Sequence, residues 1–248
     1  MKGNLKASFR VLAIIILSAM LVLTATSCIR LTGVRGSGNV VTEERSVSGF
    51  DKVAVSAGMN LYLEQGDKEY LKIEAEDNIL QNITTEVNGG KLTIKFKNLL
   101  GNVSAREPIN VYLTVIALKE LYASSGVVID SKEINTESLK INISSGAEGE
   151  MALKADSINV SLSSGSTLKL SGIVESQKVN LSSGVDYRAS DLVSKNAKIN
   201  VSSGARAKVS VSANLDVNIS SGASVEYSGT PAIVSNISSG GSLKNTGS

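Results

Sequence analysis

The stretch Ile199–Val211, INVSSGARAKVSV, contains the unit that decides the fold of this 248-residue chain. Its tripeptide Ser-Ser-Gly occurs seven times, and successive copies are 18 to 20 residues apart. The copies end at Gly126, Gly146, Gly165, Gly184, Gly204, Gly222 and Gly240. A short unit repeated at nearly constant spacing is typical of a solenoid, in which each unit is one coil that buries its apolar face against its neighbours.

Polar and apolar residues alternate on both sides of each tripeptide. The position four residues before the glycine is occupied in turn by Tyr122, Asn142, Ser161, Asn180, Asn200, Asn218 and Asn236. The position four residues after it is always charged and holds Asp130, Glu150, Lys169, Arg188, Lys208, Glu226 and Lys244. The positions that flank these columns are mostly apolar. Alternation with a period of two predicts strands that bury one face and expose the other.

The repeat therefore predicts an all-β fold, a right-handed parallel β-helix with 18 to 20 residues per coil. Each coil would be two short strands joined at a Ser-Ser-Gly corner, with a looser return such as SGIVESQ (residues 171–177). Glycine permits positive φ at the corner. We expect the serine hydroxyls to bond between coils or to the corner backbone, and the asparagines to form an amide ladder. A β-sandwich or barrel is the alternative, although neither needs the same tripeptide at every turn.

The N-terminus has the pattern of an export signal. Residues 1–27 combine a basic start, an apolar run and small residues before Cys28, which is the single cysteine of the chain. Ala25-Thr26-Ser27-Cys28 resembles the lipobox of bacterial lipoproteins, in which the cysteine after the cleavage site is lipid-modified. Cleavage that leaves a free thiol, or an uncleaved anchor helix, are the alternatives. Residues 28–37 would then be the lipidated cysteine and a tether.

The remaining chain reads as one continuous domain, residues 38–248. We expect residues 38–120 to form less regular β-coils that can cap the rod of stacked coils. We expect residues 121–248 to form the regular Ser-Ser-Gly coils. Asn88-Gly89-Gly90 before KLTIKFK is a hairpin signal. The preceding NILQNITTEV (residues 78–87) fits either a strand or a short helical turn.

Residues 36–67, GSGNVVTEERSVSGFDKVAVSAGMNLYLEQGD, followed by the Ser-Ser-Gly coils, resemble the auto-transporter adhesin, head GIN domain family. Gly49-Phe50, Ser56-Ala57-Gly58 and Gln65-Gly66-Asp67 carry the resemblance, which covers roughly residues 36–245. It implies an exported β-helical protein of the type common in Bacteroidetes, often a lipoprotein. It supplies no catalytic residues, and a fold does not fix a function.

Composition excludes several kinds of chemistry. The chain has no histidine, which removes the usual proton shuttle of Ser–His triads and the commonest zinc ligand. Cleavage before Cys28 would remove three basic residues and change the formal net charge from +2 to −1. A near-neutral domain gives no electrostatic reason to bind nucleic acid. We expect no cofactor and no structural metal.

One acidic group is a candidate for chemistry. Asp130, Glu148 and Glu150 fall in outward columns of adjacent coils, and Asp130 and Glu150 would lie about 5 Å apart, as do the carboxylates of retaining glycosidases. The three acids also fit a calcium site, or a solvated face. Flanking aromatic residues are not expected, since Tyr187 and Tyr227 fall in inward columns and Tyr122 is alone in its outward column.

The favoured function is a non-enzymatic lipoprotein of the cell envelope, most simply at the outer membrane, that serves as a binding, adhesion or structural module. Its expected partners are a membrane through Cys28 and a glycan or protein ligand. Self-association is a further possibility, because the ends of a β-helix are open strand edges. The alternative function is a polysaccharide-active β-helix enzyme, either a lyase or a hydrolase, that uses the acids near Asp130 and Glu150.

Overall fold

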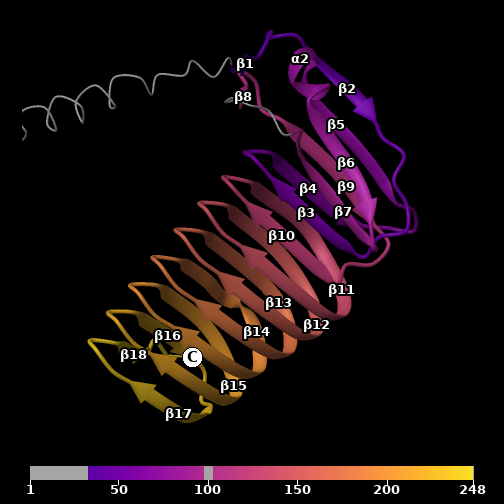
Figure 1. Ribbon diagram of the computed structural model, residues 1–248. Helices are drawn as coiled ribbons and strands as arrows, with labels where there is room; N and C mark the ends of the chain where they lie inside the picture. Colours follow the sequence, from indigo (N-terminus) through magenta and orange to yellow (C-terminus); the bar gives the residue numbers. More distant parts are fainter. Residues whose placement is uncertain (1–32, 98–102, 248) are drawn as a thin grey trace, which may run out of the picture.

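The structure is a computed structural model that describes residues 33–97 and 103–247. It is a β-solenoid, a stack of coils that extends from a capped N-terminal end to the C-terminus (Figure 1). The predicted parallel β-helix is confirmed.

The first half contains β1 (Val34–Arg35), β2 (Val40–Glu44), β3 (Lys52–Ser56), β4 (Asn60–Gln65), β5 (Tyr70–Glu76), α2 (Asp77–Leu80), β6 (Ile83–Asn88), β7 (Lys91–Phe96), β8 (Val103–Ser104) and β9 (Asn110–Val115). The second half contains β10 (Glu120–Ser124), β11 (Val128–Ile143), β12 (Glu148–Leu162), β13 (Thr167–Leu181), β14 (Asp186–Val201), β15 (Arg206–Ile219), β16 (Ser224–Ser228), β17 (Ala232–Ile237) and β18 (Ser242–Asn245).

Each Ser-Ser-Gly corner is a tight turn with two residues at positive φ. The glycine has φ between 68° and 76°, as predicted, but the second serine also lies in the left-handed region, with φ between 48° and 61°. In four corners the N–H of the residue after the glycine donates to the carbonyl of the first serine, as in Ala147 N to Ser144 O at 3.2 Å. Two consecutive positive φ values with this bond make a type I′ turn, the turn that reverses a chain within two residues.

The backbone, and not the serine hydroxyls, links one corner to the next. The glycine N–H donates to the carbonyl of the second serine of the following coil, as in Gly184 N to Ser203 O at 3.1 Å and Gly204 N to Ser221 O at 3.0 Å. In the described parts of the chain, the corner serine hydroxyls make no hydrogen bond, so the expected hydroxyl contacts are wrong. The second serines point into solvent at the tip of the turn, where their side chains are exposed.

The expected division of each coil into two short strands is also wrong. Strands β11 to β15 run for 14 to 16 residues without a break from one corner to the next. The return bend is made by register shifts, such as the one between Ser131 and Ile134, while pairing to the adjacent coils continues. The last coil does break, between β16 and β17, at Pro231, which has no N–H to donate to the ladder.

The inward columns fill the rod. The residue after the corner glycine is buried in six of the seven corners, and in three of them it is an alanine: Ala147, Ala205 and Ala223. Tyr187 is fully buried and donates its hydroxyl to Gln177 Oε1 at 2.9 Å, so it belongs to the core as its column predicts. Burial raises the pKa of the Tyr187 phenol. Among residues 33–97 and 103–247, the buried apolar side chains all lie between Phe50 and Tyr227, which residues 29–248 include.

The N-terminal region continues the solenoid and then closes it. Ser56-Ala57-Gly58 joins β3 to β4 with φ values of 71° and 68° at Ala57 and Gly58, so this turn repeats the corner geometry. β7 pairs parallel to β3, and β9 pairs parallel to β4. Antiparallel strands follow, since β6 pairs with β7, β5 with β9 and β2 with β5, and they lie at the capped end in Figure 1. The predicted hairpin at Asn88-Gly89-Gly90 joins β6 to β7 and is confirmed, while residues 78–87 contribute to both α2 and β6.

The buried carboxylate of Glu76 fastens the start of the described chain to this cap. It accepts the N–H groups of Gly38 at 2.6 Å and of Arg106 at 2.8 Å. Burial acts to raise the pKa of Glu76, but the backbone N–H donors and the Arg106 charge outweigh it and hold this pKa below its ordinary value. The ionised form is thus the one that the fold stabilises.

A first prediction concerns Gly172, where β13 passes close to the backbone of β12. A Cβ at this position would lie 2.0 Å from the Leu153 carbonyl oxygen, and φ is +111°. We expect Gly172→Ala to lower the free energy of unfolding by about 3 kcal/mol or more. Gly184→Ala is the matched control, because its Cβ would meet no atom within 4 Å, and its cost is about 1 kcal/mol of backbone strain. Urea denaturation measures both, and equal losses would contradict the close approach at Gly172.

A second prediction concerns acid sensitivity of the cap. Because the folded pKa of Glu76 is lowered, its contribution to stability is complete above the unfolded pKa and is lost as the pH falls through the folded value. The Gly38 and Arg106 amides should be protected from hydrogen exchange at pH 7 and lose protection as the pH falls below the ordinary range of a glutamate pKa. Glu76→Gln should weaken their protection already at pH 7, whereas Glu86→Gln, an exposed change on β6, should not. Protection that is insensitive to both pH and Glu76→Gln would contradict this role.

Candidate binding surfaces

Two outward columns on the strand segment before each corner line a long groove, which we call the Asn–Ser groove. One column contains Tyr122, Asn142, Ser161, Asn180, Asn200, Asn218 and Asn236, and the other contains the first corner serines from Ser124 to Ser238. The groove has a volume of about 860 Å³ and extends over Ala54 of β3 and Thr93 of β7. Its lining residues are all uncharged. The parallel register places equivalent residues on successive rungs about 4.8 Å apart, so the groove repeats along the rod.

The predicted amide ladder is present in the floor of this groove. Asn200 Nδ2 donates to Asn180 Oδ1 at 2.9 Å, and Asn218 Nδ2 donates to Asn200 Oδ1 at 3.0 Å. Ser161 interrupts the column, and Asn142 Nδ2 is buried without a hydrogen-bond partner among the described residues. A buried unpaired donor costs about 1–3 kcal/mol, so a ligand oxygen that reached this atom would gain a strong contact.

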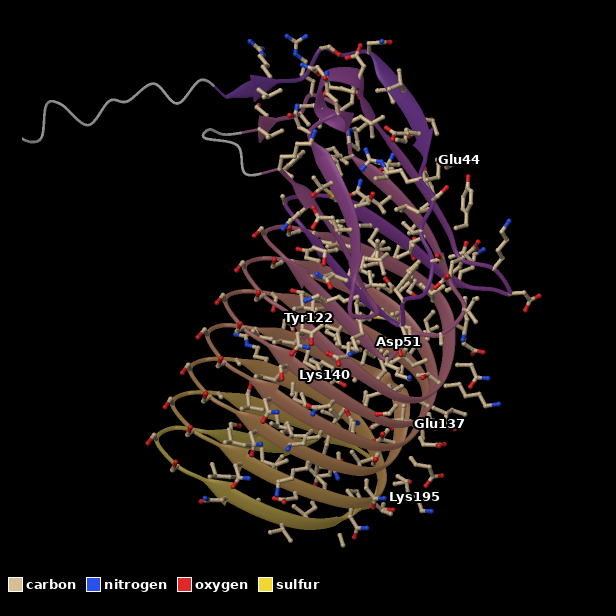
Figure 2. All side chains as sticks on the ribbon, turned by 45° about the vertical axis from the view of Figure 1, so that its right-hand side comes forward. Glu44, Asp51, Tyr122, Glu137, Lys140 and Lys195 are labelled. Atoms are coloured by element: carbon tan, nitrogen blue, oxygen red, sulfur yellow. The ribbon has the colours of Figure 1, made fainter. Side chains whose placement is uncertain are left out.

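Tyr122 closes the N-terminal end of the asparagine column. Its hydroxyl bonds to Glu120, and this contact raises the pKa of Tyr122 and lowers that of Glu120. The ammonium groups of Lys91 and Lys140 each lie 5.9 Å from the ring centroid. Figure 2 shows Tyr122 and Lys140 on successive coils. Tyr122 is therefore a fixed aromatic residue at the edge of the groove and not a free side chain.

The charged column lies on the strand segment after the corner, which faces the opposite side of the coil. Asp130 pairs in register with Glu150, so these two acids occupy neighbouring rungs as expected, and Glu148 lies in the adjacent outward column. Glu150 Oε1 forms an ion pair with Lys169 Nζ at 2.8 Å. Within residues 33–97 and 103–247, no group of three acidic side chains is close enough to hold a metal ion. Surface ion pairs of this kind contribute little to stability.

The charged column continues into aromatic residues that the sequence analysis missed. Asp130 pairs with Tyr62, and Tyr62 pairs with Tyr112. The two tyrosine rings stack with centroids 5.0 Å apart and an interplanar angle of 16°. The expectation that no aromatic residue flanks the acids is therefore wrong. The available signal was the shared pattern Asn-apolar-Tyr-Leu in residues 60–63 and 110–113, but the long insertion between them hid their common register.

These tyrosines form one side of a second hollow, which we call the tyrosine pocket. It has a volume of about 360 Å³. Its lining residues are Tyr62, Leu63, Glu64, Tyr70, Lys72, Tyr112, Leu113, Thr114, Asp130 and Lys132. Of the three acids singled out from the sequence, Asp130 is the one that the structure brings to a pocket, while Glu148 and Glu150 lie along the open face.

Cys28 and the predicted signal peptide lie outside the described residues. Within the described residues, no helix has the length and apolar composition needed to cross a membrane.

A stack of parallel coils with uncharged polar ladders on one side places the molecule among the β-solenoid proteins. Residues 49–231 match the family described as "Putative auto-transporter adhesin, head GIN domain", and the chain belongs to this family. The resemblance seen in the sequence is thereby confirmed. No curated protein matches the chain.

Solved structures share the whole fold at low sequence identity. A "putative adhesin" from Bacteroides fragilis has a TM-score of 0.79 at 19% identity, covering 86% of this chain and 100% of its own. A "putative lipid binding protein" from Parabacteroides distasonis has a TM-score of 0.72 at 23% identity, covering 87% and 100%. A "putative adhesin" from Parabacteroides merdae has a TM-score of 0.71 at 18% identity, covering 86% and 99%. At these identities the similarity establishes the fold and not the side-chain chemistry.

A third prediction concerns the amide ladder. Asn200 is bonded to Asn180 on one side and to Asn218 on the other, so Asn200→Ala leaves two neighbours without their partner. We expect a loss of about 1–3 kcal/mol in the free energy of unfolding. Asn159→Ala, an exposed change on β12, should cost less than about 0.5 kcal/mol. Urea denaturation of the two variants checks this, and a neutral Asn200→Ala would mean that the ladder is not stabilising.

Proposed function

We propose that this protein is a non-enzymatic adhesion module of the cell envelope, held on a membrane by lipid-modified Cys28. The rod would bind an extended, uncharged polysaccharide in the Asn–Ser groove. The observation that carries this proposal is the groove itself, a continuous polar surface that crosses the successive Ser-Ser-Gly coils. Membership of the adhesin family supports a binding role and an exported or cell-surface location.

The chemistry of the groove favours a neutral polyhydroxylated chain. Asparagine amides and serine hydroxyls both donate and accept hydrogen bonds, as sugar hydroxyls do. The lining contains no charged residue that could neutralise an ionic polymer. An extended peptide lying along the groove would cross the strands, so it could not add to the sheet through its backbone. A polysaccharide lying along the rod would instead meet a repeated set of contacts, and weak contacts add up through repetition.

The acids near Asp130 give weaker support for a catalytic role than the Asn–Ser groove gives for a binding role. Glycoside hydrolysis needs one carboxyl that stays protonated and another that is ionised. Glu150 lies on an open face, where its side chain is 65% exposed and paired with Lys169, so Asp130 and Glu150 do not share an enclosed site. For this reason a polysaccharide-active enzyme is not part of the proposal.

A fourth prediction tests the groove. Residues 29–248 without the lipid should bind neutral polysaccharides on a glycan array, with no release of new reducing ends. Ser182→Tyr, which fills the groove beside Asn180, should abolish this binding. Thr167→Tyr is the matched control, since it adds the same bulk at an outward position of β13 after the corner. Loss of binding in both variants, or in neither, would contradict a site in the groove. Release of new reducing ends would support the alternative function, a polysaccharide-active enzyme.

A fifth prediction tests the anchor. Cells that express the full chain and are fed a labelled fatty acid should incorporate the label into the protein, because Cys28 is the proposed site of acylation. Acyl chains hold a protein to a bilayer by about 0.8 kcal/mol per CH₂, so the labelled protein should be found in the membrane fraction. Cys28→Ser should lose the label and move the protein from the membrane fraction to the soluble fraction. Retention of Cys28→Ser in the membrane would indicate an uncleaved anchor helix.

A further inference from the structure

The tyrosine pocket is built on Tyr62, one face of which is open to a ligand. Tyr112 covers the other face at 5.0 Å, and the Lys72 ammonium lies 4.2 Å from the Tyr112 ring on the far side of the stack. Both faces of the Tyr112 ring are therefore covered, one by Lys72 and the other by Tyr62. The next rung in the opposite direction carries the short side chain of Asp130, which leaves space over the ring of Tyr62.

Fixed polar groups surround this open face. Lys132 Nζ and Glu64 Oε2 form an ion pair at 2.5 Å, and Thr114 Oγ1 donates to Glu64 Oε1 at 3.2 Å. The ion pair lowers the pKa of Glu64 and raises that of Lys132, so both groups stay charged at neutral pH. Both side chains are exposed at the rim of the pocket, where their charged groups are accessible to a ligand.

Tyr70 forms another wall of the pocket and is also held in place. Its hydroxyl donates to Glu44 Oε1 at 2.7 Å, and this contact raises the pKa of Tyr70. Figure 2 shows Glu44 on the N-terminal cap. Tyr70 is still 38% exposed, as is Tyr62. Two partly exposed aromatic rings on rigid strands are a rare feature on a chain in which aromatic residues make up 4%.

The balance of charge identifies the class of ligand. Lys72 and Lys132 are matched by Glu64 and Asp130, so an ionic ligand gains nothing from the net charge of the lining. A wholly apolar ligand would cover these charged groups without offering hydrogen bonds, which is costly. A pyranose ring has an apolar C–H face for Tyr62 and hydroxyl groups that both donate and accept. A hollow of about 360 Å³ is near the lower end of small-molecule sites, a size suited to one or two sugar rings.

We propose that the tyrosine pocket binds a neutral sugar, one pyranose ring stacked on Tyr62 with its hydroxyls bonded to Asp130, Lys132 and Glu64. This site is separate from the Asn–Ser groove, because it lies on the strand segment after the corner and at the N-terminal end of the rod. It takes a short ligand, whereas the groove takes a long one. The two sites would let one molecule hold a chain along its length and a sugar end or branch beside it.

The test uses residues 29–248 and three disaccharides: cellobiose, maltose and N,N′-diacetylchitobiose. The chain has no tryptophan, so its fluorescence comes from six tyrosines, three of which line this pocket, and saturation-transfer NMR identifies which sugar protons touch the protein. We expect saturable binding of at least one disaccharide through its ring C–H protons. Tyr62→Ala should weaken this binding at least tenfold, and Tyr62→Phe should stay within about threefold because it keeps the ring face.

Two matched variants separate this site from the rest of the molecule. Arg188→Ala changes the same charged column three rungs beyond Asp130 and should leave disaccharide binding unchanged. Ser182→Tyr blocks the groove and should also leave it unchanged, so the two proposals can fail independently. The proposal is overturned if none of the three disaccharides binds. It is equally overturned if Tyr62→Ala, shown to be folded by circular dichroism, binds as tightly as the unaltered protein.

Discussion

The constraint on which the structure depends is the pair of adjacent residues at positive φ in every corner. A non-glycine residue in the left-handed region costs about 1–2 kcal/mol, and each coil accepts that cost at its second serine. The cost is offset because the turn lets the glycine N–H bond to the next corner, so the hydrogen-bond ladder passes through the turn without a gap. Serine is small and exposed at this position, so its side chain adds no steric clash to the backbone strain.

Because the corner sets where each coil turns, it also sets the register of everything between corners. Coils of 18 to 20 residues differ in length, and the register shifts in the return bend absorb the difference. Residues near the corner therefore align from coil to coil, and the asparagine and charged columns follow from that alignment. The regular half of the chain makes a repeated surface, whereas the irregular N-terminal half makes a local pocket. This difference in regularity is the structural basis for one long groove and one local pocket.

Membership of the adhesin family agrees with a surface built for contact, and the solved relatives share the fold over their whole length. The identity of 19% with the Bacteroides fragilis structure means that the fold is retained by the pattern of inward apolar residues and corners, and not by particular outward side chains. The outward columns are the positions that are free to differ between relatives. Ligand choice in this chain is therefore a question about Asn200, Tyr62 and their neighbours.

The sequence by itself determined the period, the inward and outward columns, the hairpin at Gly89-Gly90 and the family, because these depend on residues close together in the chain. It did not reveal that Ser203 and its equivalents take positive φ, since serine carries no such preference on its own. Only the tertiary structure decided that Tyr62 and Tyr112 share a stack with Lys72, because an insertion of irregular length separates β4 from β9. The period of the sequence indicates whether a side chain points inward or outward. Which residue lies beside it on the next rung depends on how the intervening chain folds.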